Sequence, residues 1–316
     1  MKNKLFFTSL IVASFCGNAF AAGGTDQLSV SPRAKAMGDA FVALANDAFA
    51  VRYNPAGLSR VDGFLAGISY NKPYGESFLK HFSGSVTLPW HRLFGSENKF
   101  GVSAISAEFF TVDYNNGNYN SVDNELWKES VISFSHGVKL MEDTNSSLSF
   151  GFSAKYYNLS LGKSLPDAVG NREDLGSGGT VGIDIGVQAT LWQRTSFGGY
   201  LMNINRPSFG EGIHEEDLPR KLVVGLAYEP YEQVITTLDL ERELGRDSQV
   251  KTGVEFWVVE ELALRAGINS NPNTLFAGFG LRFRGVEFDY SFSKHPVLDF
   301  TNQFGLALDL DKILKR

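Results

Sequence analysis

Residues 274–292, TLFAGFGLRFRGVEFDYSF, form two short runs joined at Arg284-Gly285. Large apolar residues occupy every second position in both runs, and glycine, arginine, serine and carboxylate residues fill most of the positions between them. A period of two is typical of a β-strand whose two faces meet different surroundings. This hairpin therefore has one apolar face and one polar face, and the question is which of them faces water.

The same period continues through most of the chain. From residue 62 onward we recognise about fourteen such runs. Long polar connections follow odd-numbered runs, at residues 114–124, 163–177 and 206–217. Most connections after even-numbered runs are tight, with WHRLFGSE at 90–97 as the exception. Sorting of loop lengths by side is typical of outer-membrane barrels and is not expected of a Greek-key sandwich. We therefore predict an all-β transmembrane fold, an antiparallel up-and-down barrel of about 14 strands.

Charged residues of both signs on the polar face indicate that this face lines the lumen. A lipid-facing charge near the bilayer midplane costs roughly 2–4 kcal/mol, whereas opposite charges pair across a polar interior. Aromatic residues at run ends, among them Trp127, Trp192, Trp257 and Phe283, are interpreted as interfacial girdles. The predicted lumen charges are Asp184, Lys251, Glu255, Arg265, Arg282, Glu287 and Asp289.

The amino terminus has the pattern of a secretory signal peptide. Lys2 and Lys4 precede an apolar run, and Ala19-Phe20-Ala21 supplies a cleavage signal, so we expect cleavage near Ala21 or Ala22. Cleavage removes the single cysteine, Cys16, and with it any disulfide or thiolate site. A lipid anchor on Cys16 is disfavoured because a phenylalanine precedes it. The predicted location is the bacterial outer membrane.

Residues 23–61 differ from the rest of the chain because they have helical spacing. Met37, Phe41, Leu44 and Ala45 fall on one stripe. Asn54-Pro55-Ala56-Gly57 is interpreted as a helix cap, a proline at the first helical position and a glycine stop. The predicted division is a signal peptide at 1–22, an N-terminal helical segment at 23–61, a barrel at 62–311 and a tail at 312–316.

The stretch SPRAKAMGDAFVALANDAFAVRYNPAGLSRV, residues 31–61, resembles the N-terminal signature of the PorV/PorQ family. LPRKLVVGLAYEP, LDLERE, GVEFW, LALRAGINS and AGFGLRF resemble that family's C-terminal half, whereas residues 63–200 match by pattern alone. The family is similar to the FadL-type fatty-acid transporters, which implies a fourteen-stranded barrel with an N-terminal hatch in its lumen. By this resemblance Asn54, Pro55, Ala56 and Gly57 form the hatch motif. ALDLDKILKR departs from the aromatic ending of many barrels and leaves Phe304 as the nearest insertion signal.

The predicted hatch suggests two kinds of functional residue. The motif at 54–57 marks either the hinge of a gate or a capped helix end that anchors the plug. Arg33, Asp39, Asp47 and Arg52, together with Lys35, are expected to pair with lumen charges and to hold the hatch in place. Each partly buried pair contributes about 1–3 kcal/mol.

Other motifs argue against enzyme or cofactor chemistry. GSGGTVG at 176–182 lacks the Gly-Lys-Ser/Thr ending of a phosphate loop and is interpreted as a flexible loop. HEEDLP at 214–219 matches no cation-ligand spacing, and no G-x-S-x-G is present. The net charge of −6 and the absence of a basic cluster exclude nucleic acid as a partner. We therefore expect no catalytic residues, metal or cofactor.

The resemblance implies two functions. The first is a docking or shuttle component for exported proteins, as in type IX secretion, which needs a stable barrel with a loop surface. The alternative is FadL-like passive transport of small hydrophobic compounds, gated by the hatch. The expected partners are outer-membrane lipid, secretion-system proteins or exported cargo, and a small hydrophobic ligand.

Overall fold

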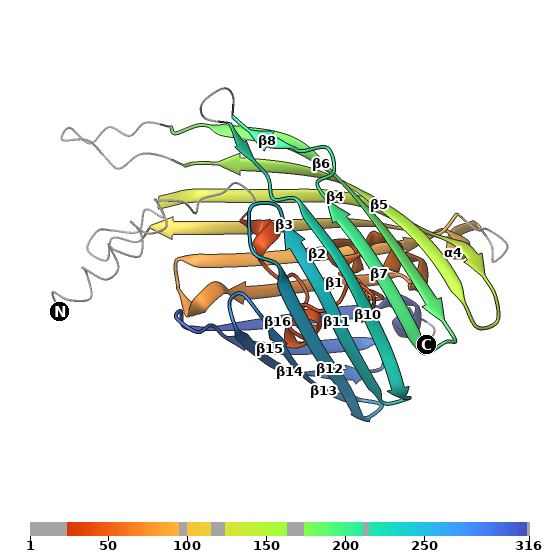
Figure 1. Cartoon of the computed structure of the whole chain (residues 1–316). Coiled ribbons are helices and arrows are strands. Elements are labelled where there is room, and N and C mark those ends of the chain that lie inside the picture. The colour runs from red at the N-terminus through yellow and green to blue at the C-terminus, as the bar shows by residue number, and fades with distance from the viewer. Residues whose placement is uncertain (1–23, 95–99, 115–123, 163–173, 211–214, 315–316) are drawn as a thin grey trace, which may run out of the picture.

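The computed structural model describes residues 24–94, 100–114, 124–162, 174–210 and 215–314. The predicted signal peptide and Cys16 lie outside these residues. Fourteen antiparallel strands close into one barrel, in which β1 pairs with β16 (Figure 1). The strands are β1 Leu65–Lys72, β2 Leu79–Pro89, β3 Val102–Tyr114, β4 Asn124–Glu142, β5 Ser147–Ser160, β6 Ser177–Leu191, β7 Thr195–Met202, β10 Lys221–Tyr231, β11 Val234–Glu243, β12 Gln249–Val259, β13 Leu262–Asn269, β14 Thr274–Phe283, β15 Val286–Lys294 and β16 Phe300–Asp309.

The predicted fold class is confirmed, and the apolar face of the wall points outward. In the β14–β15 hairpin, Leu275 is 59% exposed and Phe283 is 64% exposed, whereas Ser291 is fully buried on the inner side. The barrel pairs its strands without a free edge, as a spanning sheet must. The apolar face of residues 274–292 thus faces the surroundings of the barrel, and the polar face lines the lumen.

The loop between β7 and β10 contains more structure than expected. A two-stranded hairpin, β8 (Ser208–Phe209) with β9 (Glu216–Asp217), lies within it. Phe209 and Leu218 of this loop are buried against Val131, Tyr157 and Leu159 on the inner faces of β4 and β5. The loop therefore folds partly into the barrel mouth. GSGGTVG, interpreted above as a flexible loop, instead begins β6 from Ser177 onward.

Two aromatic residues expected in the girdles lie on the inside of the wall. Trp127 packs beside the buried cluster of β4 and β5, and Trp257 donates from Nε1 to a carboxylate oxygen of Glu255 at 3.3 Å. Trp257 shares the inner face with Glu255 because the two residues are separated by two positions. Phe283 is 64% exposed on the outer face of β14, and Trp192 is 73% exposed in the β6–β7 turn.

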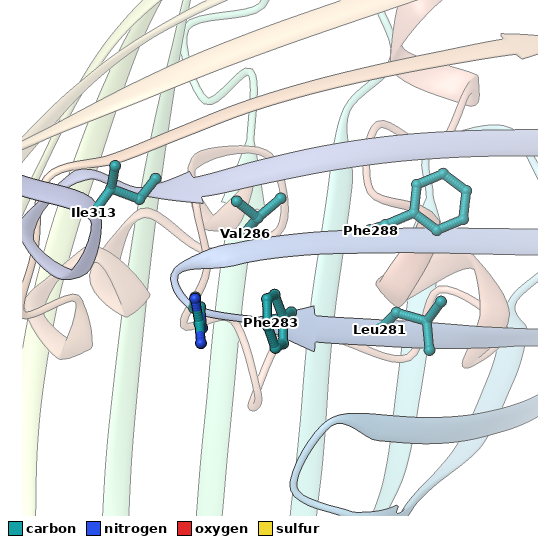
Figure 2. A pocket seen from close by; sticks show the side chains of 6 residues that line it. Leu281, Phe283, Val286, Phe288 and Ile313 are labelled. Carbon is teal, nitrogen blue, oxygen red and sulfur yellow. The ribbon is translucent and has the colours of Figure 1, made fainter.

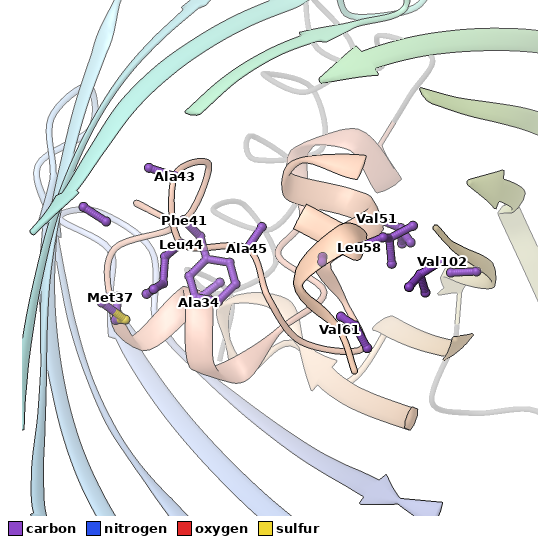
Figure 3. Packing of buried hydrophobic residues seen from close by; sticks show 13 residues of the cluster. Ala34, Met37, Phe41, Ala43, Leu44, Ala45, Val51, Leu58, Val61 and Val102 are labelled. Atoms are coloured by element: carbon purple, nitrogen blue, oxygen red, sulfur yellow. The ribbon is translucent and has the colours of Figure 1, made fainter. Parts of the chain in front are cut away.

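Short helical pieces of residues 24–61, which we call the hatch, fill the barrel (Figures 1 and 3). Met37, Phe41 and Leu44 are buried in one cluster, together with Leu58 and with Val102 of the wall. None of the helices in the described part of the chain has both the length and the hydropathy needed to cross a membrane. The helical pieces of the hatch are η1 Thr25–Gln27, α2 Pro32–Ala36, α3 Ala50–Tyr53 and η2 Pro55–Arg60.

The helical stripe predicted over Met37–Ala45 is wrong in conformation, although its residues are buried. α2 ends at Ala36, because Gly38 and Asp39 adopt positive φ angles of 68° and 58° and turn the chain. Glycine takes this left-handed conformation without steric cost, and aspartate tolerates it better than most residues. The apolar side chains beyond the turn then reach the core from irregular backbone.

α4 (Trp90–Phe94) and α5 (Leu310–Leu314) lie at the end of the barrel that carries most of the short turns. Arg92 Nε is 3.9 Å from a carboxylate oxygen of Asp311, and the Leu310 amide donates to the Phe64 carbonyl at 2.9 Å. The chain after the last strand is thereby held against the start of β1. In outer-membrane barrels the short turns are typical of the periplasmic end. Another short helix, η3 (Pro73–Gly75), lies in the β1–β2 connection at the opposite end.

Candidate functional site

The interface between the hatch and the inner wall is the candidate site. On ten strands the wall presents a glycine where the hatch approaches, and a Cβ atom added at any of these glycines would lie within 3.0 Å of a hatch atom. Hatch backbone or small side chains fill the space that larger wall residues would need. We call these residues the glycine belt: Gly67, Gly137, Gly151, Gly186, Gly198, Gly225, Gly253, Gly267, Gly278 and Gly305.

The tightest part of the belt faces the Asn54-Pro55-Ala56-Gly57 motif. Gly151 pairs directly with Gly137 on one side and with Gly186 on the other. Three neighbouring strands therefore have no side chain at the same level of the wall. The backbone of Pro55 and Ala56 occupies this flat surface. A side chain at Gly151 would meet backbone atoms, which cannot rotate away.

Asn54 is a fully buried cap that joins the hatch to the wall. Its Oδ1 accepts from the Ala56 amide at 3.1 Å, and its Nδ2 donates to the carbonyl oxygens of Val42 and Val187, both at 2.9 Å. The structure thus places the motif at a capped, anchored helix start. The prediction that Gly57 ends the helix is wrong. Gly57 lies inside η2, where a Cβ would collide with Ala45.

One group of buried charges fixes α2 to the wall, and we call it the Glu255 network. The Arg33 guanidinium donates to both carboxylate oxygens of Glu255 at 2.8 Å. Arg265 donates to Glu255 at 2.6 Å and to Asp289 at 2.5 Å, and lies 3.8 Å from Glu287. Four of the predicted lumen charges and one predicted hatch charge therefore meet in one place. Two arginines and several carboxylates compensate each other away from water.

A second group, the Asp26 network, holds the first described residues of the hatch. Arg52 lies 3.1 Å from Asp26 and 3.4 Å from Glu108, and Tyr157 donates to Asp26 at 2.9 Å. Further contacts connect η1 to the wall. Thr25 donates to Glu129 at 2.7 Å, Lys221 donates to the Asp26 carbonyl at 2.8 Å, and Lys155 lies 3.9 Å from Asp26. Within the wall, Lys155 also pairs with Asp184 at 2.6 Å.

Sequence reasoning missed most of the Asp26 network. Glu108, Glu129 and Lys155 occupy inner positions of runs whose outer positions are apolar, so their alternation carried the signal. Asp26 precedes the recognised family motif, and nothing in the spacing marks it. Its role depends on the folded path of the chain.

The remaining predicted charges have other partners. Asp39 accepts from the Tyr53 hydroxyl at 3.2 Å, and Asp47 accepts from the Phe49 amide at 2.9 Å, so both interact within the hatch. Burial raises the pKa of Asp47 to about 6, although Arg33 acts in the opposite direction. Burial also lowers the pKa of Lys35 to about 8, against the influence of Asp39.

Two predicted lumen charges, Lys251 and Arg282, lie outside both networks. Lys251 pairs with Glu241 at 2.5 Å across neighbouring strands of the wall. Arg282 lies at the end of β14, where it is half exposed, pairs with Glu287 at 3.1 Å and stacks over Trp257 at 4.5 Å. Arg282 therefore belongs to the barrel rim.

A cavity of about 90 Å³ lies between the hatch and the wall formed by β7, β10, β11 and β12. One side is apolar, because Val42, Tyr200, Met202 and Val223 form a packed cluster there. The hatch residues Asp26–Ser29 line the cavity as well. The lining is completed by Tyr53 and by the charged residues Asp39, Arg52, Lys221, Asp239, Glu241 and Lys251.

The wall next to this cavity has an unusual joint. β6 pairs with β7 only over Ile185–Leu191, so its residues Ser177–Asp184 lack a strand partner on that side. The side chain of Asn205 replaces the strand: it accepts from the Ile183 amide at 2.9 Å and donates to the Val181 carbonyl at 2.7 Å. One backbone bond, from the Ile204 amide to the Ile183 carbonyl at 2.9 Å, completes the joint, which is easier to displace than a continuous ladder.

Charge reversal of Arg52 tests whether the Asp26 network holds the hatch. In Arg52→Glu a third carboxylate would lie beside Asp26 and Glu108, and breaking a buried pair typically costs about 3–5 kcal/mol. Trypsin cleavage after Arg33 and Lys35 should then become at least about tenfold faster than in the wild type. Mass spectrometry of the cleaved chain measures the rate. Arg242→Glu, which reverses an exposed side chain bonded to Ser248, should leave the rate unchanged. Equal rates in all three proteins would contradict the role given to Arg52.

Within the described residues, no group of three or more histidine, cysteine, aspartate or glutamate side chains is arranged to hold a metal ion. His214 of the HEEDLP stretch lies outside these residues, and the next residue, Glu215, accepts from Ser208 at 2.7 Å. The charges of the described lumen pair with one another and with the hatch.

Comparison with protein-family models and with curated proteins finds no match. Solved structures of outer-membrane barrels do match. They include the Pseudomonas putida toluene transporter TodX, with a TM-score of 0.57, 14% identity and coverage of 89% of this chain and 97% of that chain. The Ralstonia pickettii toluene transporter TbuX matches with a TM-score of 0.54 and 13% identity, over 88% of this chain and 96% of that chain. A Pseudomonas aeruginosa FadL homologue matches with a TM-score of 0.53 and 11% identity, over 89% of this chain and 99% of that chain. The chain thus shares the fold of FadL-type outer-membrane barrels.

Proposed function

We propose that the protein is an outer-membrane conduit for small, mainly apolar compounds, opened by movement of part of the hatch. The cavity between hatch and wall carries the proposal, because its apolar side includes Tyr200 and Met202 of β7, the strand that leads into the joint at Asn205. Two proteins of the same fold are described as toluene transporters, which supports small aromatic hydrocarbons as the first compounds to test.

The hatch contains a fixed part and a releasable part. Pro32–Ala56 rests on the glycine belt, and its displacement would expose an apolar core. Residues Thr25–Ser29 are held mainly by polar contacts to Glu129, Arg52 and Glu243. Hydrogen bonds to charged groups contribute about 1.5–3 kcal/mol each, and water that enters as these residues move replaces part of that. Movement of these five residues alone would therefore remove the hatch side of the cavity lining formed by Asp26–Ser29 and open the cavity.

Filling the cavity tests the proposal. Val223 faces the cavity from β10, and Val223→Trp would occupy its volume with an indole ring. We expect uptake of labelled toluene by cells carrying the variant as their only such channel to fall by at least about tenfold. The measurement is the initial uptake rate at equal amounts of folded barrel in the outer membrane.

The neighbouring residue provides a matched control. Val224 points to the outside of the same strand and is 46% exposed, so Val224→Trp adds the same ring away from the cavity. Its uptake should equal that of the wild type. Wild-type cells that take up toluene no faster than cells without the protein would refute transport of this compound class.

A docking role in protein secretion is the second candidate. The PorV/PorQ-like stretch at residues 31–61 favours it, as does the close seating of that stretch on the glycine belt, because a docking barrel needs a lumen that stays filled. Affinity purification of the protein from native outer membrane, followed by proteomic and lipid analysis, separates the two candidates. Stoichiometric recovery of exported proteins supports docking, and recovery of the barrel without them supports transport.

A further inference from the structure

A second concave site lies on the outside of the barrel at its short-turn end, away from the hatch. It is a notch of about 530 Å³ lined by Leu281, Phe283, Arg284, Val286, Phe288 and Ile313. Figure 2 shows Leu281 and Phe283 on one strand, Val286 and Phe288 on its neighbour, and Ile313 from the helix that follows the last strand. This volume falls within the range of about 300–1,000 Å³ typical of small-molecule sites.

The chain past β16 builds the lower edge of the notch. The Asp309 amide donates to the Gly285 carbonyl at 2.7 Å and brings α5 under the β14–β15 turn. Gly285 has a φ angle of 86° and lies so close to α5 that a Cβ there would be 2.9 Å from the Lys312 Cβ. Ile313 then faces the hairpin. The C-terminal extension therefore completes a site that the strands alone would leave flat.

Arg284 gives the notch a charge. Its guanidinium lies over the ring of Phe283, 4.9 Å from the ring centre, and thus on the outer face of the hairpin. The neighbouring cations have carboxylate partners: Arg282 pairs with Glu287 and Lys312 with Asp309, both at 3.1 Å. Among the described residues no carboxylate lies within ion-pair distance of Arg284. The notch is consequently apolar with one positive charge at its rim.

We propose that the notch binds a phospholipid of the periplasmic leaflet, with an acyl chain against Leu281, Phe288 and Ile313 and the phosphate on Arg284. The occupant must be apolar along the notch and anionic at its rim, and the surroundings of a barrel at this end are lipid. Arginine binds phosphate through two parallel N–H donors, and long cationic side chains extend along apolar surface to reach a headgroup. This proposal rests on insertion of the barrel in a membrane and is independent of transport.

Lipid titration tests it. The full-length protein in detergent micelles is titrated with phosphatidylglycerol and, separately, with diacylglycerol of the same chains, and bound lipid is counted by native mass spectrometry. We expect the wild type to bind phosphatidylglycerol about tenfold more tightly than diacylglycerol, as one charge-assisted contact provides. Arg284→Gln should lose this preference and keep the weaker binding.

Two further variants separate the contribution of Arg284 from that of the apolar lining. Arg194→Gln removes another turn arginine at the same end, whose guanidinium donates to the Pro230 carbonyl at 3.3 Å, and should behave as the wild type. Leu281→Trp fills the notch while retaining Arg284, and should weaken both lipids. Heat-modifiable migration in gels verifies that each barrel is folded. Equal binding of the two lipids by the wild type, or a preference that survives in Arg284→Gln, would overturn the proposal.

Discussion

Gly151→Val is expected to prevent the hatch from occupying the lumen. The new side chain would project into the backbone of Pro55 and Ala56, which are held in turn by Asn54. Overpacking of a dense interior typically lowers stability by about 1–3 kcal/mol. At Gly151 the loss should lie at the upper end of this range, because the colliding atoms belong to the backbone and cannot rotate away. We expect a loss of stability of about 3 kcal/mol or more.

The measurement is urea unfolding of the purified barrel in lipid vesicles, together with protease digestion of the hatch. Gly84→Ala is the matched control, because a Cβ at Gly84 would lie 3.7 Å from its nearest neighbour, at ordinary contact distance. This variant should unfold as the wild type does. If Gly151→Val retained both wild-type stability and a protected hatch, the glycine belt would not be what seats the hatch.

Glu255→Ala is expected to have an effect of similar size, through charge rather than volume. Removal of this carboxylate leaves Arg33 without its bidentate partner and Arg265 with only part of its compensation. Breaking a buried ion pair by removing one member typically costs about 3–5 kcal/mol. The midpoint of urea unfolding, followed by tryptophan fluorescence, should fall accordingly, and the hatch should become sensitive to protease.

Glu287→Gln serves as the control for this network. Its carboxylate is partly exposed and lies 3.8 Å from Arg265, so its loss should cost less than about 1 kcal/mol. The double variant Arg33→Met with Glu255→Leu replaces a charged pair by apolar groups and should recover part of the loss. A Glu255→Ala barrel as stable as the wild type would show that the network does not hold α2.

The wall of the barrel was predictable because each strand carries its own evidence. In β14 the outward Leu275 and Leu281 alternate with inward residues, and a period of two cannot be mistaken when both faces are so different. Loop length then distinguished the two ends. Trp257 shows where this reasoning was applied too loosely: it shares a face with Glu255, so the alternation itself placed it inside.

The hatch was less predictable because its conformation depends on contacts distant in sequence. A helical stripe through Met37 and Phe41 looked continuous, but Gly38 and Asp39 end α2, and the following residues are buried by the wall instead. Arg33 and Glu255 were each recognised as charges in need of partners, yet 222 positions separate them. Their pairing follows from the barrel's closure, which no local pattern encodes.

The glycine belt also links the stability of the wall to the presence of the hatch. The hatch precedes β1 by only residues 62–64, and ten strands have a glycine where it approaches, so an empty lumen would leave those ten positions without contacts. Glycine contributes no side-chain packing of its own and weakens a strand interior by roughly 0.5–1 kcal/mol relative to alanine. We therefore expect the wall to be less stable without the hatch than with it, so that the two parts unfold together.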